Sequence, residues 1–184
     1  MIKLGEKQDL TVIKLVDFGV YLAAEDAKEE KVLLPRKQVP EGTKAGDVLH
    51  VFVYRDSKDR LIATTNEVKL TLGQVALLKV SQVGKIGAFL DWGLEKDLFL
   101  PFREQTKPVE EGEECLVALY IDKSNRLCAT MKLYPYLKTD GEFQVDDRIM
   151  GRVYEISRNF GAFVAVDDIY SGLIPMKELY GKVE

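Results

Sequence analysis

The stretch FGVYL, residues 18–22, introduces a pattern that occurs three times in this chain of 184 residues. It returns as IGAFL at 86–90 and as FGAFV at 160–164. Each copy holds an apolar or aromatic residue, Gly, a small or aliphatic residue, an aromatic ring and an aliphatic residue. Such self-similarity indicates repeated structural units. In every unit a later apolar run closes with Pro, at Pro35, Pro101 and Pro175.

A second block of sequence supports the repeat. VFVYRDSKDRLIATT at 51–65 matches VALYIDKSNRLCATM at 117–131, and each block lies the same distance after the Pro of its own unit. Both blocks alternate apolar and polar residues as half-buried strands do, around the polar tetrads DSKD and DKSN that favour type I turns. Five short strands in about 60 residues predict a small closed barrel rather than a sandwich.

The repeats predict an all-β chain of tandem barrels with an incomplete third barrel. The predicted units are residues 1–68, 74–137 and 147–184, and the last contains only the N-terminal strands of a barrel. The linker at 66–74 is short, which predicts that the first two barrels pack together. The linker at 134–146 is longer and becomes acidic toward its end.

Strand alternation predicts the direction of the aromatic rings. If residues 19–22 form a strand, Val20 and Leu22 face the barrel interior and Tyr21 faces outward. An outward ring beside a strand Gly is an accessible platform, and stacking of a base on it is worth about 1–3 kcal/mol. The same count places Phe89 and Phe163 outward and Ala88, Leu90, Ala162 and Val164 inward.

Plainer interpretations of these rings stay open. Phe18 and Phe160 lie three positions before the outward ring, where strict alternation makes them core residues. They join the platform only if the Gly marks a bulge or a strand start. For Tyr21, Phe89 and Phe163 the alternative is packing against a neighbouring barrel.

Composition excludes several classes of protein. The net charge of −4 argues against a strongly basic nucleic-acid binder and leaves room only for a local patch. Two Cys residues form no disulfide framework and indicate a reduced, cytoplasmic protein. The sequence has no apolar run long enough to span a membrane and no signal core at its N-terminus. It shows no nucleotide fingerprint, no metal-ligand spacing and no catalytic set around the single His50, so we expect no enzyme, cofactor or metal.

The rings and glycines of FGAFV, followed by GLIP and an Asp–turn–Arg hairpin, resemble the S1 RNA-binding domain, which is a five-stranded OB-fold barrel. The order of the units is similar to that in the conserved virulence factor B (CvfB/YitL-like) family of bacterial S1-domain proteins. The resemblance covers essentially the whole chain, and GAFLDWGLEKDLFLPF at 87–102 carries it most specifically. It implies tandem OB-fold barrels that bind single-stranded RNA and have a regulatory role.

The resemblance implies binding residues at five positions of an S1 barrel: two rings, one His, and the Asp and Arg of the last hairpin. Pro replaces the His in all three units, which puts sequence-selective reading in doubt. In unit two Ile86 replaces the first ring, so this unit is the weakest match. The implied RNA-binding residues are Phe18, Tyr21, Asp56 and Arg60 in unit one, Phe89, Asp122 and Arg126 in unit two, and Phe160 and Phe163 in unit three.

Three of the polar or aromatic residues have structural alternatives. Arg60 and Arg126 suit contacts with phosphate or base, but each could instead form a surface ion pair with the Asp of its own turn, worth about 0–1 kcal/mol. Trp92 is expected in the core or between barrels rather than as an exposed stacking ring.

The resemblance also implies a larger protein. Family members continue beyond this chain's end with the rest of the third barrel and a winged-helix domain. An incomplete barrel leaves unpaired strand edges. We therefore expect either that the chain is a fragment or that residues 147–184 pair with another element.

The sequence thus predicts a non-enzymatic, cytoplasmic, single-stranded RNA-binding protein that regulates gene expression. Binding should be modest and salt-sensitive, because bases stack on a few rings and the phosphates meet only a local patch. The alternative is a protein-docking module of the ribosome or RNA-decay machinery that buries Tyr21 and Phe89 against protein. The acidic net charge is the best support for that alternative.

Overall fold

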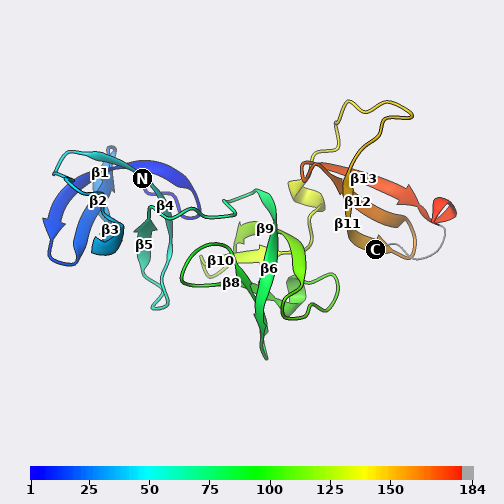
Figure 1. Cartoon of the computed structure of the whole chain (residues 1–184), viewed down its shortest axis with the longest axis horizontal. Coiled ribbons are helices and arrows are strands. Elements are labelled where there is room, and N and C mark those ends of the chain that lie inside the picture. The colour runs from blue at the N-terminus through cyan, green and yellow to red at the C-terminus, as the bar shows by residue number, and fades with distance from the viewer. Residues whose placement is uncertain (180–184) are drawn as a thin grey trace.

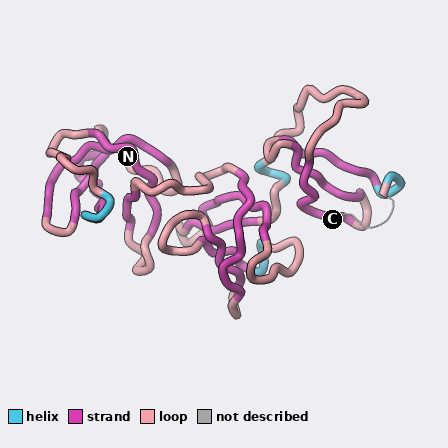
Figure 2. The backbone as a smooth tube through the Cα atoms, viewed as in Figure 1, coloured by secondary structure: helices cyan, strands magenta, loops and turns pink. Residues whose placement is uncertain are grey.

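The computed structural model describes residues 1–179, and it consists of three β-sheets that follow one another along the long axis of the molecule (Figure 1). Strands and loops make up nearly all of the backbone (Figure 2). The helices are single 3-10 turns, so within the described residues no helix has the length and apolar character needed to cross a membrane. The predicted all-β fold class is confirmed.

The first sheet is a closed five-stranded barrel with the strand order β1-β2-β3-β5-β4. Its interior is aliphatic, with Val20 and Leu22 buried as alternation predicts, while Tyr21 on the outer face stays half-buried. This filling is what a barrel of such small radius requires. Its strands are β1 (Lys7–Val16), β2 (Gly19–Ala24), β3 (Ala27–Pro35), β4 (Val48–Arg55) and β5 (Leu61–Thr64).

The second sheet repeats this arrangement in the order β10-β9-β6-β7-β8. Strands β8 and β10 lie side by side, so the barrel is nearly closed. Ala88 and Leu90 are buried inside it, and Phe89 is half-buried on the outer face, as predicted. The strands are β6 (Val75–Val83), β7 (Gly87–Asp91), β8 (Leu98–Pro101), β9 (Glu114–Ile121) and β10 (Leu127–Thr130).

The third sheet contains the three strands β11 (Gly151–Ser157), β12 (Gly161–Val166) and β13 (Tyr170–Pro175) in sequence order, and it is open. Ala162 is fully buried, but Val164 is only half-buried, because no further strands close the interior in the described part of the chain. Ala165 and Tyr154 pack on Leu116 and other residues of the second barrel and join the two sheets.

The strands β3, β8 and β13 end at the predicted prolines, and each is followed by one 3-10 turn. These turns are η1 (Arg36–Gln38), η2 (Phe102–Glu104) and η4 (Met176–Glu178), and η3 (Tyr134–Tyr136) leads from the second barrel toward the third sheet.

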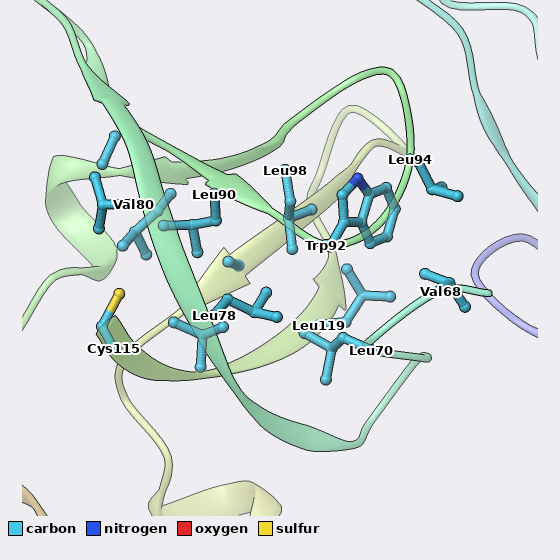
Figure 3. Close-up of a cluster of buried hydrophobic side chains, with 14 of the residues drawn as sticks. Val68, Leu70, Leu78, Val80, Leu90, Trp92, Leu94, Leu98, Cys115 and Leu119 are labelled. Carbon is cyan, nitrogen blue, oxygen red and sulfur yellow. The ribbon is translucent and has the colours of Figure 1, made fainter. Parts of the chain in front are cut away.

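An aromatic cluster joins the first two barrels. Phe52 and Tyr54 lie on the outer face of β4, and their rings meet Trp92 edge-on at centroid distances of 5.6 and 6.3 Å. Trp92 is only 2% exposed, and its indole N–H donates to the backbone oxygen of Lys96 at 2.7 Å. Figure 3 shows Trp92 near Leu94, Val68 and Leu70, all in one buried cluster. Trp92, expected in the core or between barrels, is buried between the two barrels, whose predicted packing is confirmed.

The Gly of each repeat is required by the backbone. Gly19 has φ +153°, and a Cβ on it would lie 2.1 Å from the backbone oxygen of Leu34 on the neighbouring strand. Gly161 has φ +128° and would bring a Cβ to 2.0 Å from the oxygen of Ile174. No side chain fits at these distances, so only Gly lets the neighbouring strand pair this closely. The same Gly leaves the outer face open.

Candidate nucleic-acid interface

The outer face of the first barrel carries an aromatic pair, in which Phe18 is exposed and Tyr21 is half-buried. Phe18 is 57% exposed, and its ring stands perpendicular to that of Tyr21 at a centroid distance of 6.2 Å. The core alternative for Phe18 is therefore wrong. Strand β2 begins at Gly19, so Phe18 lies before the strand and alternation does not apply to it.

A cationic side chain lies over the Tyr21 ring of this pair. The Lys31 ammonium is 4.8 Å from the centroid of the Tyr21 ring, within the range of a cation–π contact. Lys31 precedes Leu33 by two residues on β3, and Leu33 lies opposite Tyr21 in the ladder. Alternation along β3 therefore puts Lys31 on the same face of the sheet as Tyr21. The sequence analysis did not use this signal.

The last hairpin of the first barrel holds its Arg by an ion pair within the turn. Arg60 Nε donates to Asp56 Oδ2 at 3.0 Å, and Nη2 lies 2.9 Å from the same oxygen. The Asp59 N–H donates to the Asp56 backbone oxygen at 2.9 Å, which closes the predicted turn. Partial burial alone would raise the pKa of Asp56. Hydrogen bonds from the Arg60 backbone and guanidinium and from the Lys58 backbone outweigh it and lower this pKa.

The second barrel builds its platform differently. Phe89 on β7 lies opposite Phe99 on β8, and the two ring centroids are 5.4 Å apart with planes tilted by 35°. Phe99 thus provides the second ring at this face, where Ile86 replaces the first ring. The sequence interpretation missed Phe99, although alternation in the run LFLP puts it on the same outer face as Phe89.

The hairpin of the second barrel also differs from its counterpart. Asp122 Oδ1 accepts from the backbone N–H groups of Ser124 and Arg126 at 2.8 and 3.0 Å. Among the described residues, however, the Arg126 guanidinium forms no ion pair with Asp122. Its Nε lies 3.8 Å from Oδ1 of Asp59, which belongs to the first barrel. Arg126 therefore forms an ion pair, as the structural alternative predicted, but its partner belongs to the first barrel and not to its own turn.

The two hairpins and the Phe89–Phe99 pair enclose a cleft of about 510 Å³, called here the interbarrel cleft. This volume lies within the range of ligand pockets. Its cationic residues are Arg55, Lys96, Arg103 and Arg126, its acidic residues are Asp59, Asp97 and Asp122, and its rings are Tyr54, Phe89, Trp92 and Phe99.

The third sheet presents a more apolar face. Phe160 is 62% exposed, so its core alternative is wrong as well. Phe163 is half-buried, with Tyr134 and Tyr154 at centroid distances of 6.3 and 6.0 Å, and this geometry favours the packing alternative for it. The groove of about 320 Å³ at this face has neither Lys nor Arg among the described residues that line it. These are Tyr134, Tyr154, Glu155, Phe160, Phe163 and Leu173.

The two cysteines are free and buried. Burial, with a smaller contribution from Asp122, raises the pKa of Cys128 to about 11. Burial likewise raises the pKa of Cys115 to about 11, with Glu113 contributing less. Both side chains therefore stay thiols at neutral pH, which does not favour a nucleophile or a metal ligand. Within residues 1–179, no group of three His, Cys, Asp or Glu residues is arranged to hold a metal ion.

Comparisons with known proteins agree with this geometry. A family model described as an S1 domain matches residues 4–66 and 72–132. YitL of Bacillus subtilis (strain 168) is 28% identical over 174 residues, which cover 89% of this chain and 57% of YitL. Conserved virulence factor B of Staphylococcus saprophyticus is 26% identical over 132 residues, which cover 69% of this chain and 44% of that protein. The chain spans about half the length of the curated relatives it matches.

A solved structure shares the fold. The crystal structure of a multidomain protein with nucleic acid binding domains from Streptococcus pneumoniae superimposes with a TM-score of 0.62. The match has 22% sequence identity and covers 97% of this chain and 65% of that protein.

Proposed function

The chain belongs to the S1 domain family, with relatives of the conserved virulence factor B and YitL type, and from this membership we propose that it binds single-stranded RNA. The solved structure with the same fold is described as having nucleic acid binding domains, which supports a nucleic-acid-binding role. RNA is preferred as the ligand because its single-stranded regions leave bases free to stack on exposed rings.

One observation carries the proposal: exposed Phe18 and half-buried Tyr21 form a ring pair on the outer face, and the Lys31 ammonium lies over the Tyr21 ring. Rings and a cation at one site suit the two parts of a nucleotide, because the base stacks on the ring and the phosphate attracts the ammonium. Asp56 and Arg60 of the same barrel belong to the proposed interface as well. The other proposed members are Phe89, Asp122 and Arg126 of the second barrel and Phe160 and Phe163 of the third sheet.

We also propose that the protein is a non-enzymatic regulator in the cytoplasm. The family is one of binding domains, and the two buried thiols are compatible with a reducing compartment. Ribosomal or RNA-processing proteins are proposed as further partners.

A docking role for protein is favoured by a separate observation. Within residues 1–179, no cation lines the apolar groove at Phe160 and Phe163, and these residues suit an apolar side chain better than a phosphate. Docking is the second proposal, and it concerns the third sheet rather than the two barrels.

Fluorescence anisotropy with a labelled 12-nucleotide oligouridine tests the RNA proposal. The wild-type chain should bind at low salt and lose affinity as salt rises. The Phe18→Ala/Tyr21→Ala variant should bind at least about fivefold more weakly, because stacking on a ring is worth about 1–3 kcal/mol. Phe143→Ala removes a partly exposed ring outside the proposed faces and should leave the affinity unchanged. Failure of the wild-type chain to bind any single strand at low salt would contradict the proposal.

A further inference from the structure

The hairpins of the first two barrels are joined by one guanidinium. Arg55 Nη1 donates to the backbone oxygen of Asp59 at 2.9 Å, within its own hairpin. Its Nε donates to the backbone oxygen of Asn125 at 3.0 Å, in the hairpin of the second barrel. Asp59 and Asn125 are equivalent residues of the repeat, and both have a positive φ, at 64° and 60°. The structure therefore brings equivalent turns of two barrels to a single Arg.

Further contacts hold the two barrels against each other. Lys96 Nζ, from the second barrel, donates to the Asp56 backbone oxygen at 3.0 Å. Lys37 of the first barrel is ion-paired with Glu95 of the second. Together with the buried rings around Trp92, these contacts hold the walls of the interbarrel cleft in one arrangement. A ligand that enters the cleft therefore meets a preformed site, which lowers the entropic cost of binding.

The cleft combines rings with an excess of positive charge. Of the side chains that the structure describes, four cationic and three acidic ones line it, a surplus of one positive charge in a chain whose net charge is −4. Asp122 is already engaged by two backbone N–H groups of its own turn. Asp59 is the acidic residue closest to a cleft guanidinium, and it competes for Arg126 with any anion that enters.

We propose that the interbarrel cleft is one composite site for a segment of single-stranded nucleic acid, built jointly by the first two barrels. This proposal rests on the proposed function and specifies where the strand binds. A base stacks on Phe89 and Phe99, and the adjoining phosphates bind Arg126 and Arg55. Arg55 has five N–H donors and uses two of them on carbonyl oxygens, so donors remain for a phosphate.

The composite site predicts that a residue of the first barrel controls binding at the face of the second. Arg55→Ala should weaken binding of the labelled 12-nucleotide oligouridine about tenfold. It should also make the salt dependence shallower by about 0.7 in log K against log salt, the value for one lost phosphate contact on a single strand. Lys58→Ala is the matched control, since Lys58 is exposed in the same hairpin and its loss removes one positive charge as well. Lys58 is not among the described residues that line the cleft, so its loss should change the affinity less than twofold.

A gain of affinity provides a test that partial unfolding cannot imitate. Asp59→Asn removes the carboxylate near Arg126 and introduces the residue that the second repeat already has at Asn125. Asn tolerates the positive φ of this position. The variant should bind the same oligouridine about threefold more tightly at low salt. Asp26→Asn, an exposed carboxylate away from the cleft, should have no effect.

The possible results separate the two proposals. Weaker binding by Arg55→Ala together with tighter binding by Asp59→Asn supports the composite site. If the wild-type chain binds and the ring variant of the first barrel is impaired, but Arg55→Ala and Asp59→Asn both bind as the wild type does, the composite site is wrong and the proposed function stands. If the wild-type chain does not bind, both proposals are wrong.

Discussion

The hairpins that end the first and the second barrel have the same Asp–turn–Arg pattern and hold their Arg differently. The Arg60 side chain is 68% exposed. Its Nε donates to Asp56 of its own turn, and its Nη2 is ion-paired with the same carboxylate. Arg126 is nearly as exposed, at 62%, but it reaches to Asp59 of the other barrel. The repeat therefore fixes the turn, whereas the neighbouring barrel decides what the Arg contacts. The second unit is the weakest match by sequence, yet its Arg and its rings line a cleft.

The platforms differ in the same way. The first barrel presents Phe18 and Tyr21 on an open surface, where a strand has only one wall to contact. The second barrel presents Phe89 and Phe99 inside the interbarrel cleft, where the hairpin of the first barrel supplies a second wall. A cleft that surrounds a base should bind it more tightly than an open platform of equal ring area, because more of the base is removed from water.

The largest expected effect comes from breaking the contact between the barrels. Trp92→Ala removes a buried ring that touches both Phe52 and Tyr54. The free energy of unfolding should fall by about 3–5 kcal/mol, as for other buried aromatic residues truncated to Ala. Urea unfolding measures this change, with Phe143→Ala as a control of smaller effect, because this ring is partly exposed and contacts only Tyr170 among the described aromatic rings. A loss below about 1 kcal/mol would mean that the barrels do not depend on this cluster.

A direct comparison of the two hairpin arginines should give the next largest effect. Arg126→Ala is expected to weaken oligouridine binding about tenfold, or about 1.4 kcal/mol. Arg60→Ala should weaken binding less, about threefold, because its guanidinium is already ion-paired with Asp56 of its own turn. Arg126→Lys should recover part of the loss, since it keeps the charge but not the planar fork. Equal losses for Arg60→Ala and Arg126→Ala would show that the hairpins act alike and that the difference in their contacts has no consequence.

Replacing the second ring of the cleft should have a smaller effect. Phe99→Leu gives the second barrel the residue found at the equivalent Leu33 and Leu173. Binding should weaken about fivefold, or about 1 kcal/mol, because one stacking surface is lost while the apolar contact remains. Anisotropy measures the change, and a melting temperature close to that of the wild type confirms that β8 is intact. An unchanged affinity would remove Phe99 from the site.

The smallest expected effect is on stability in acid. The pKa of Asp56 is lowered in the folded chain, so its ionised form stabilises the fold. This stabilisation is fully present above the unfolded value of about 3.8 and is lost as the pH falls through the lower folded value. The pH dependence of urea unfolding below pH 4 should therefore become shallower in Asp56→Asn. An unaltered pH dependence would show that the Asp56–Arg60 pair contributes nothing to stability.

Local patterns were sufficient for the fold and for the direction of most rings. Alternation placed Val20, Leu22 and Tyr21 correctly, because side chains of a strand must point to opposite faces of the sheet. The same rule could not place Phe18, since it lies before the strand that Gly19 begins. Phe99 could have been found by applying the rule to β8 as well.

The interbarrel cleft could not be predicted from the repeat. Arg126 meets Asp59, and Arg55 meets Asn125, only because the rings around Trp92 set how the second barrel sits on the first. That arrangement depends on packing between residues far apart in the sequence, which no local pattern encodes. The alignment of the repeats predicted that each Arg would pair with the Asp of its own turn, whereas Arg126 pairs with Asp59 of the first barrel.

The most direct test of the composite site is to map the contacts of a bound strand. A 12-nucleotide oligouridine that contains 4-thiouridine, crosslinked by light and analysed by mass spectrometry, reports which peptides lie against the bases. We predict crosslinks to the peptides that contain Phe89 and Phe99 and to the Arg55–Arg60 hairpin, and we predict that Arg55→Ala reduces both. Crosslinks confined to the open face at Phe18 and Tyr21, or to the third sheet, would contradict a site shared by the two barrels.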